Sequence, residues 1–306
     1  MSEIIFSARS LTKRYRRLHA LDSVNMEVRR GDIYGFVGEN GAGKTTLIRV
    51  LAGLAAPDGG EIALFGETGG LAKGRRRIGG MVETPAVYPN FTARENLEVC
   101  RMQRGIADRR SIDRALETVG LTDTGKKKAK NFSLGMKQRL GLAMALLGDP
   151  EFLILDEPVN GLDPAGIMEF RELLRKLNAE RGITILISSH LLAELFQLAT
   201  CYGFIHKGRM LEQVTIADLT EKFHKQLHLR VDDPDRAIAV LEAHSFGGRK
   251  LMAERTGGNA LRISDMPKSN ADIVRALVAG GVGVEEVAVR GDALEDYYMS
   301  LIGGRR

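Results

Sequence analysis

The sequence predicts an α/β fold that is built on a buried parallel sheet and is followed by a second, smaller α/β domain. Two observations predict the main fold. A glycine-rich segment joins a strand pattern to a helix pattern, and two short, continuous apolar runs flank an amphipathic helix pattern, as in the βαβ units of a parallel sheet. A change of character after about residue 214 predicts the second domain.

Length and composition fit two globular domains. The 306 residues are 44% hydrophobic and 27% charged, which allows a sizeable core. The net charge of +5 is scattered along the chain, so no nucleic-acid partner is expected. Cys100 and Cys201 are too far apart to indicate a disulfide framework or a metal site. No apolar run reaches the roughly 18 residues of a membrane span, and “MSEIIFSARS” has an acid where a signal peptide carries positive charge. We therefore expect a protein of the reducing cytosol that reaches a membrane through a partner.

The patterns of the main fold run in chain order. Strand patterns that are bounded by turn residues lie at residues 4–15, 23–28, 31–38, 151–158 and 182–190. Helix patterns, with apolar residues at three- and four-residue spacing, lie at residues 44–54, 92–105, 108–120, 134–148 and 165–182. The helix patterns between about residues 92 and 149 predict a helical block inside the α/β frame. We expect this main domain to cover residues 1–214.

Residues 215–306 alternate strand and helix patterns. The strand patterns lie at residues 226–233, 259–265 and 284–291, with a weaker one at 249–255, and the helix patterns at residues 234–245, 270–281 and 293–303. This order resembles a split βαβ module and contains no motif that carries chemistry. The sequence therefore predicts a small C-terminal accessory α/β (split βαβ-like) domain.

The glycine-rich segment “GENGAGKTT”, residues 38–46, matches the pattern G-x-x-x-x-G-K-[ST] between a strand and a helix. In such a loop, glycines let backbone N–H groups curve around phosphate oxygens, and the helix N-terminus adds the positive end of its dipole. The lysine bridges the β- and γ-phosphates, and the hydroxyl after it faces Mg²⁺. We expect a nucleotide and Mg²⁺ here, with the nucleotide bound by Gly38, Asn40, Gly41, Gly43, Lys44, Thr45 and Thr46.

A second motif, “FLILDEP”, places Asp156 and Glu157 at the end of a predicted buried strand. Adjacent residues at a strand end face different ways. One carboxylate can therefore hold Mg²⁺, usually through water, while the next polarises a hydrolytic water. Taken alone, the pair is equally compatible with a cap or turn before Pro158. The phosphate loop favours the catalytic interpretation.

With three further motifs, the chain resembles the ATP-binding subunit of an ABC transporter over residues 1–214. The motifs follow the family's order: “GENGAGKTT” as Walker A, “FSLGMKQRL” at the signature, “FLILDEP” as Walker B, “NGLDP” as the D-loop and “SSH” as the switch-histidine loop. The resemblance implies a P-loop NTPase core with an antiparallel β subdomain and an α-helical subdomain at about 92–149. It also implies ATP as the nucleotide and ATP hydrolysis as the activity.

The resemblance assigns catalytic and metal roles. It implies that Glu157 positions or deprotonates the attacking water, that His190 senses the γ-phosphate, and that Asp156 and Thr45 belong to the Mg²⁺ site. The family usually has glutamine at the position of Glu83, a residue that touches the metal or water. A carboxylate there still offers a hard oxygen ligand but adds negative charge near the phosphates.

Other residues are expected at the edges of the nucleotide site. The resemblance implies that Tyr15 stacks on adenine, although a half-buried strand residue is an equally good interpretation of it alone. Ser133 and Gly135 of the signature and Asp163 of the D-loop are expected at the interface with a second ATPase subunit, whose nucleotide the signature faces. Leu134 replaces the first of the family's two signature glycines. Its side chain faces either toward the nucleotide or away from it.

The variants “VETP” and “SLGMKQRL” are similar to the bacitracin-resistance and lantibiotic-immunity branch of ABC exporters. This resemblance implies a homodimeric ATPase subunit at the cytoplasmic face of the membrane. There it would power export of a peptide antibiotic, drug or related amphiphile through a separate integral-membrane permease. The alternatives are an importer subunit, a non-hydrolysing regulator, and a cytosolic ABC ATPase that acts on DNA or ribosomes. A single Walker A motif and the lack of sustained heptads disfavour the last of these.

Overall fold

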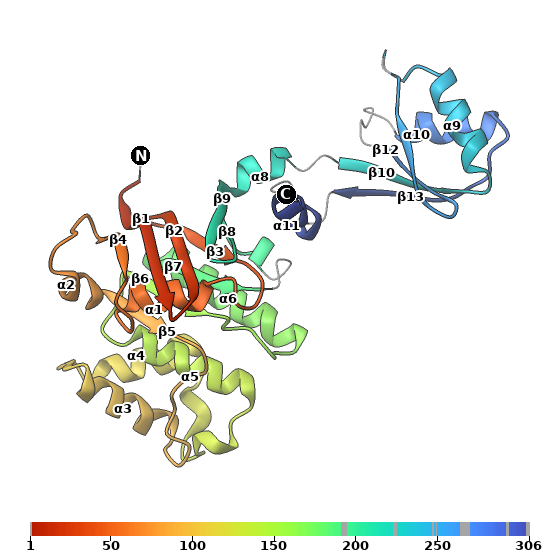
Figure 1. Cartoon of the computed structure of the whole chain (residues 1–306). Helices are drawn as coiled ribbons and strands as arrows, with labels where there is room; N and C mark the ends of the chain where they lie inside the picture. The colour runs from red at the N-terminus through yellow and green to blue at the C-terminus, as the bar shows by residue number, and fades with distance from the viewer. Residues whose placement is uncertain are drawn as a thin grey trace. The chain divides into compact units, whose positions relative to one another are not determined.

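The computed structural model describes residues 2–190, 195–222, 225–246, 248, 250–263, 270–291 and 294–303. The chain divides into two compact units, Met1–Ile216 and Ala217–Arg306 (Figure 1). None of the helices within the described ranges is both long enough and apolar enough to cross a bilayer.

The first unit is built on a six-stranded sheet. Its strands lie in the order β5 (Ile78–Met81), β6 (Phe152–Asp156), β7 (Thr184–Ser189), β3 (Ile33–Val37), β8 (Cys201–His206) and β9 (Arg209–Thr215). All neighbouring pairs are parallel except β8 and β9. The central strands β3, β6 and β7 are buried along their whole length, as their unbroken apolar runs predict. The predicted α/β fold with a buried parallel sheet is confirmed.

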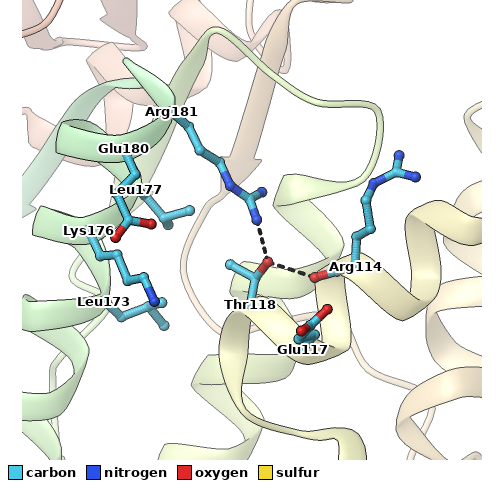
Figure 2. A pocket seen from close by; sticks show the side chains of 8 residues that line it. All are labelled: Arg114, Glu117, Thr118, Leu173, Lys176, Leu177, Glu180 and Arg181. Carbon is cyan, nitrogen blue, oxygen red and sulfur yellow. Dashed lines mark hydrogen bonds between the residues drawn. The ribbon is translucent and has the colours of Figure 1, made fainter.

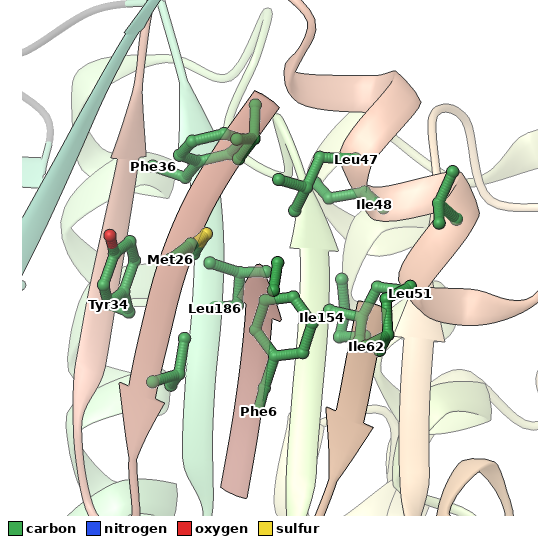
Figure 3. Close-up of a cluster of buried hydrophobic side chains, with 14 of the residues drawn as sticks. Phe6, Met26, Tyr34, Phe36, Leu47, Ile48, Leu51, Ile62, Ile154 and Leu186 are labelled. Carbon is green, nitrogen blue, oxygen red and sulfur yellow. The ribbon is translucent and has the colours of Figure 1, made fainter. Parts of the chain in front are cut away.

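A second, antiparallel sheet and one helix cover this sheet. The antiparallel sheet has the order β2 (Leu18–Arg29), β1 (Ile4–Tyr15) and β4 (Gly59–Leu64), and helix α1 (Lys44–Ala52) follows β3. The cluster that joins α1 to both sheets includes Phe6, Met26, Tyr34, Phe36, Leu47, Ile48, Leu51, Ile62, Ile154 and Leu186 (Figure 3). Burying each such side chain contributes about 1.5–3 kcal/mol. The apolar core therefore fixes α1, and with it the loop that precedes α1.

Four further helices of the first unit match predicted helix patterns: α3 (Ala93–Gln103), α4 (Arg110–Val119), α5 (Leu134–Leu146) and α6 (Pro164–Arg181). The short helix α2 (Leu71–Arg75) was not predicted. Helix α3 begins with a capping box, because Thr92 Oγ1 accepts from the Glu95 N–H at 3.2 Å and the Glu95 carboxylate accepts from the Thr92 N–H at 2.6 Å. Helix α6, whose side chains Phe170 and Leu174 are buried, packs against β7.

The second unit alternates strands and helices. Its elements are β10 (Lys225–Val231), α9 (Pro234–Ala243), β11 (Ala253–Gly257), β12 (Ala260–Ile263), α10 (Asn270–Ala279), β13 (Val284–Gly291) and α11 (Leu294–Gly303), and α8 (Ile216–Lys222) precedes them. The strands form an antiparallel sheet in the order β11-β12-β10-β13, which is a split βαβ arrangement. The weak strand pattern at 249–255 marks a strand that begins at Ala253.

An ion-pair network lies at the amino end of β6. Arg77 donates to both oxygens of Glu151, at 2.6 and 2.7 Å, and Arg30 donates to Glu151 Oε2 at 3.0 Å. The hydrogen bond from Arg77 is the main cause that lowers the pKa of Glu151 from 4.5 to about 2. Because the folded pKa lies below the unfolded one, this network stabilises the fold above pH 4.5 and loses its effect as the pH falls toward 2.

We predict that Glu151→Gln lowers the free energy of unfolding by about 1 kcal/mol at pH 7, because a partly exposed pair is screened by solvent. The difference from wild type should shrink as the pH falls from 4.5 toward 2, the interval between the unfolded and folded pKa values of Glu151. Urea unfolding of both proteins at several pH values measures it. Glu172→Gln, which removes an exposed pair within α6, is the control. A difference that stays constant with pH would contradict the prediction.

Candidate active site

The loop between β3 and α1 has a backbone that requires glycine. Gly43 has φ +114°, and a Cβ added there would lie 2.6 Å from the carbonyl oxygen of Ala20. A Cβ at Gly38 would lie 2.5 Å from the carbonyl oxygen of Ile205, and Gly41 has φ +81°. Asn40 and Gly41 are exposed at the mouth of the loop. The glycine pattern therefore reflects close backbone approaches on the inner side of the loop.

The start of α1 leaves its first N–H groups available to an anion. Gly43 is the N-cap and provides no side-chain acceptor, and the first turn contains no acidic residue. Thr45 and Thr46 are half-buried in this turn. Unpaired N–H groups and the positive end of the helix dipole together suit phosphate oxygens. The loop geometry therefore fits the phosphates of a nucleoside triphosphate.

Lys44 places a buried positive charge at the centre of the loop. Its side chain is 4% exposed, and its Nζ donates to the carbonyl oxygens of Gly38 at 2.6 Å and Glu39 at 3.1 Å. Its third neighbour is Glu157 Oε1 at 3.3 Å. A buried ammonium group must be paired, and three acceptors match its three N–H groups. When a nucleotide binds, phosphate oxygens would have to replace these oxygens as the acceptors of Lys44.

The hairpin of β8 and β9 supports the loop from outside. The Gly208 N–H donates to the Ala42 carbonyl at 2.9 Å, and the Asp22 N–H donates to the Gly208 carbonyl at 2.8 Å. The same region of β2 contacts Gly43 through Ala20. Tyr15 pairs with Leu18 at the nearby end of the β1–β2 hairpin and is 43% exposed. Tyr15 is therefore an exposed aromatic residue at the end of the hairpin whose second strand, β2, contacts the loop.

The two acidic residues at the end of β6 have different surroundings. Asp156 is buried, and its Oδ1 accepts from the Ser188 hydroxyl at 2.6 Å. The Ser188 Oγ in turn accepts from the Glu157 N–H at 3.0 Å. Ser188 thus holds the Asp156 carboxylate and the backbone of Glu157 at once. This residue was missed by sequence reasoning, although it is the first serine of “SSH”.

Glu157 joins the phosphate loop to the end of β7. Its Oε1 lies 3.3 Å from Lys44 Nζ, and its Oε2 lies 2.9 Å from His190 Nδ1. Its φ of +46° is uncommon for a residue with a side chain, and such strain is concentrated at functional sites. The structure therefore brings Lys44, Glu157 and His190, three residues from distant parts of the sequence, into one cluster.

Residues suited to Mg²⁺ lie beside this cluster. Thr45 offers a hydroxyl at the start of α1, which packs beside β6, and β6 ends at Asp156. Across the described ranges, no group of three or more His, Cys, Asp or Glu side chains forms a metal cage. Mg²⁺ commonly binds through one or two protein ligands together with substrate phosphates, so the residues present fit this ion.

Glu83, the third predicted metal residue, pairs with a different group. It follows β5, has φ +59°, and forms an ion pair with the guanidinium of Arg49 on α1. Both side chains are about half exposed, so the pair contributes about 0–1 kcal/mol. The negative charge that glutamate adds at this position is balanced by Arg49, which sequence reasoning did not identify.

The signature residues begin a helix elsewhere in the unit. Ser133 is the N-cap of α5, and its Oγ accepts from the Met136 N–H at 3.2 Å, which confirms the predicted helix start. Asp163 is the N-cap of α6 and accepts from the Gly166 N–H at 2.9 Å. Ser133, Gly135 and Asp163 line one open cavity of about 380 Å³. Within the described ranges, no hydrogen bond or ion pair joins Ser133 to the Lys44 cluster.

Leu134 lies against the D-loop of its own chain. Its side chain is 44% exposed, and its Cδ2 would lie 3.1 Å from a Cβ at Gly161. A Cβ at Gly135 would in turn lie 3.7 Å from Leu162 Cδ2. The Leu134 side chain, at a position where the family has glycine, thus fills the space next to Gly161, which has no side chain of its own. The signature and the D-loop of one chain are packed together.

Another cavity, of about 320 Å³, lies between α4 and α6 (Figure 2). Arg181 closes one side by donating to Thr118 Oγ1 at 2.7 Å, and the Thr118 hydroxyl donates to the Arg114 carbonyl at 2.6 Å. Basic and acidic side chains are mixed along its walls. It contains none of the predicted site residues.

Comparison with known proteins gives the family. A family model described as “ABC transporter” matches residues 21–160. The “Bacitracin transport ATP-binding protein BcrA” of Bacillus licheniformis is 45% identical over 306 residues, which cover 99% of each chain. The “Lantibiotic transport ATP-binding protein SrtF” of Streptococcus pyogenes is 41% identical over 221 residues, which cover 71% of this chain and 95% of that protein.

A solved structure shows the same fold. It is described as cbiO1 from Clostridium perfringens, part of an ABC transporter complex; it is 27% identical, covers 72% of this chain and 92% of its own, and has a TM-score of 0.65. This chain belongs to the family of ABC transporter ATP-binding proteins, and its activity is nucleotide binding and ATP hydrolysis.

Proposed function

We propose that this chain powers export of a peptide antibiotic, drug or related amphiphile through a separate membrane permease. The observation that carries the ATPase chemistry is the cluster of Lys44, Glu157 and His190 at the phosphate loop. The export direction rests on the relatives, which are named for bacitracin and lantibiotic transport, and on full-length similarity to the former. The chain would act at the cytoplasmic face of the membrane, held there by the permease.

Lys44 acts first in the proposed mechanism. Its ammonium leaves the carbonyls of Gly38 and Glu39 and binds the β- and γ-phosphates of ATP, which the loop amides surround. This exchange also releases Glu157 Oε1 from its contact with Lys44. Binding of ATP therefore frees the carboxylate that the reaction needs. Mg²⁺, when bound by Thr45 and Asp156, supplies neutralisation of phosphate charge.

Glu157 acts on the attacking water. In hydrolysis, the water oxygen bonds to the γ-phosphorus, the bond from that phosphorus to the ADP oxygen breaks, and the water proton passes to the Glu157 carboxylate. The contact at 2.9 Å between His190 Nδ1 and Glu157 Oε2 orients this carboxylate from one side. The Ser188 hydroxyl fixes the backbone of Glu157 and the side chain of Asp156.

One chain supplies half of each proposed site. Ser133 and the amides that follow it begin α5 on a surface of the unit that is not bonded to the Lys44 cluster. We propose that they contact the γ-phosphate on a second copy, so that two ATP molecules lie in a head-to-tail homodimer. Tyr15 would stack on the adenine, and Asp163 would lie at the dimer interface. ATP then stabilises the closed dimer, and hydrolysis releases it.

We predict that Lys44→Ala weakens ATP binding at least tenfold, because the buried positive charge of the loop is lost. Glu157→Gln should keep binding, lose turnover by at least a hundredfold, and accumulate as an ATP-bound dimer. Equilibrium binding, steady-state ATPase assays and size-exclusion chromatography with ATP measure these effects. Hydrolysis by purified Glu157→Gln at the wild-type rate would show that Glu157 is not the catalytic carboxylate.

We predict that Ser188→Ala lowers kcat about tenfold to a hundredfold, since one buried hydroxyl positions both acidic residues. The KM for ATP should change little, because the side-chain hydrogen bonds of Ser188 go to Asp156 and Glu157. Ser188→Thr, which keeps the hydroxyl, is the matched control and should recover most of the activity. Equal kcat values for the alanine and wild-type proteins would refute this positioning role.

We predict that affinity purification of the chain from native membranes recovers a polytopic membrane protein. Adding ATP to the Glu157→Gln protein should increase the amount of membrane protein that is recovered, because ATP stabilises the closed dimer. The Lys44→Ala protein is the control for nucleotide dependence. Recovery of ribosomes or DNA instead of a membrane protein would replace the transport function with the cytosolic alternative.

A further inference from the structure

Arg49 and Glu83 form an ion pair that links two parts of the ATPase unit. Arg49 belongs to α1, the helix that begins at the phosphate loop, and Glu83 belongs to the segment just after β5. The side chains are 42% and 57% exposed, so water and ions reach the pair. An exposed pair of this kind exchanges partners readily. Glu83 also has a left-handed backbone conformation, with φ +59°, which residues other than glycine rarely adopt.

The position of Arg49 on α1 relates this pair to the metal site. Arg49 follows Thr45 by four residues, so both lie on one face of the helix, about 6 Å apart along its axis. The residue that pairs with Glu83 therefore lies one helical turn from Thr45, whose hydroxyl is proposed to face Mg²⁺. Among the described residues, no hydrogen bond or ion pair joins Glu83 to Thr45 or Asp156, the other two predicted metal residues.

The same segment contacts the helix that begins at the signature. A Cβ at Gly141 of α5 would lie 2.7 Å from both Met81 Sδ and Pro85 Cβ, so α5 packs closely against residues 81–85. The segment is thus held by Pro85 on the α5 side and by Glu83 on the α1 side. The contact with α5 is a tight apolar fit, whereas the contact with α1 is an exposed ion pair. Of the two, the ion pair is the one that a cation can replace.

We propose that Arg49 is a positioning residue of the ATPase: it holds Glu83 while the site lacks the nucleotide–cation complex and releases it when that complex binds. The proposal rests on the proposed ATPase function and on the place beside Mg²⁺ that the family resemblance implies for Glu83. The guanidinium holds the Glu83 carboxylate on the side of Arg49 and offsets its charge, so it opposes the move of this carboxylate to a metal ion. This proposal explains why residue 83 is glutamate where the family usually has glutamine, because a neutral amide would not form an ion pair with Arg49.

The test measures binding rather than turnover. A non-hydrolysable ATP analogue is titrated onto the full-length chain at increasing Mg²⁺ concentrations, and the half-saturating Mg²⁺ concentration is read. Arg49→Met should lower this concentration about twofold to fivefold, since it removes a competitor worth one exposed ion pair. In a Glu83→Gln background, Arg49→Met should have no effect. Arg49→Lys, which keeps the charge, should restore the wild-type value in large part.

A second readout needs no ligand. In the nucleotide-free chain, both Arg49→Met and Glu83→Gln should raise amide hydrogen exchange in peptides that cover residues 81–91. Arg94→Met is the matched control, because Arg94 of α3 forms an exposed ion pair with Asp113 of α4 and not with α1. It should change neither the exchange of this segment nor the Mg²⁺ dependence.

Three results would overturn the proposal: an unchanged Mg²⁺ dependence in Arg49→Met, the same shift in both Glu83 backgrounds, or an equal shift in Arg94→Met. These failures are distinguishable from failure of the proposed function. Lys44→Ala could lose nucleotide binding and Glu157→Gln lose turnover while Arg49→Met leaves the half-saturating Mg²⁺ concentration unchanged. In that case only the role of Arg49 is wrong. If Glu157→Gln hydrolyses ATP normally, the catalytic assignment itself is wrong.

Discussion

The buried ammonium of Lys44 is the interaction on which the site depends. Lys44 is nearly inaccessible to water, yet it is charged, so its three neighbours must supply the acceptors that water would otherwise provide. Two of these neighbours are carbonyls of its own loop, and the third is the Glu157 carboxylate. The backbone of the loop is therefore wrapped around a positive charge, and the acidic residue at the end of β6 is drawn to the same point. A phosphate group suits this place both in charge and in geometry.

The rest of the first unit keeps that point in position. The apolar cluster under α1 joins the helix to the central sheet, and the β8–β9 hairpin supports the outer side of the loop through Gly208 and Ala42. The parallel pairing of β6 with β7 places Ser188 next to Asp156, and His190 follows two residues later, directly after β7. Each of these contacts joins residues that are far apart in the sequence. The fold thus brings together a charge, a carboxylate and an imidazole that no local segment contains.

The sequence predicts the parts of this arrangement that are encoded locally. The phosphate loop, the buried strands β3, β6 and β7, and the start of α5 at Ser133 all follow from short patterns that act over a few residues. It does not predict β4, β5, β8 or β9. Strands β4 and β5 contain paired glycines that weaken their propensity, and β8 and β9 are decided by pairing with β3 and with each other. The roles of Ser188 and Arg49 depend on strand register and on a contact across 34 residues, so no local pattern reveals them.

The exchange of partners at Lys44 is the central claim, and a crystal structure of Glu157→Gln with ATP and Mg²⁺ tests it most directly. We expect Lys44 Nζ to have left the carbonyls of Gly38 and Glu39 and to lie within hydrogen-bond distance of the β- and γ-phosphates. Ser133 of a second copy should contact the same γ-phosphate. A structure in which ATP is bound while Lys44 still donates to the two loop carbonyls, with no signature residue near the phosphates, would contradict this view of the site.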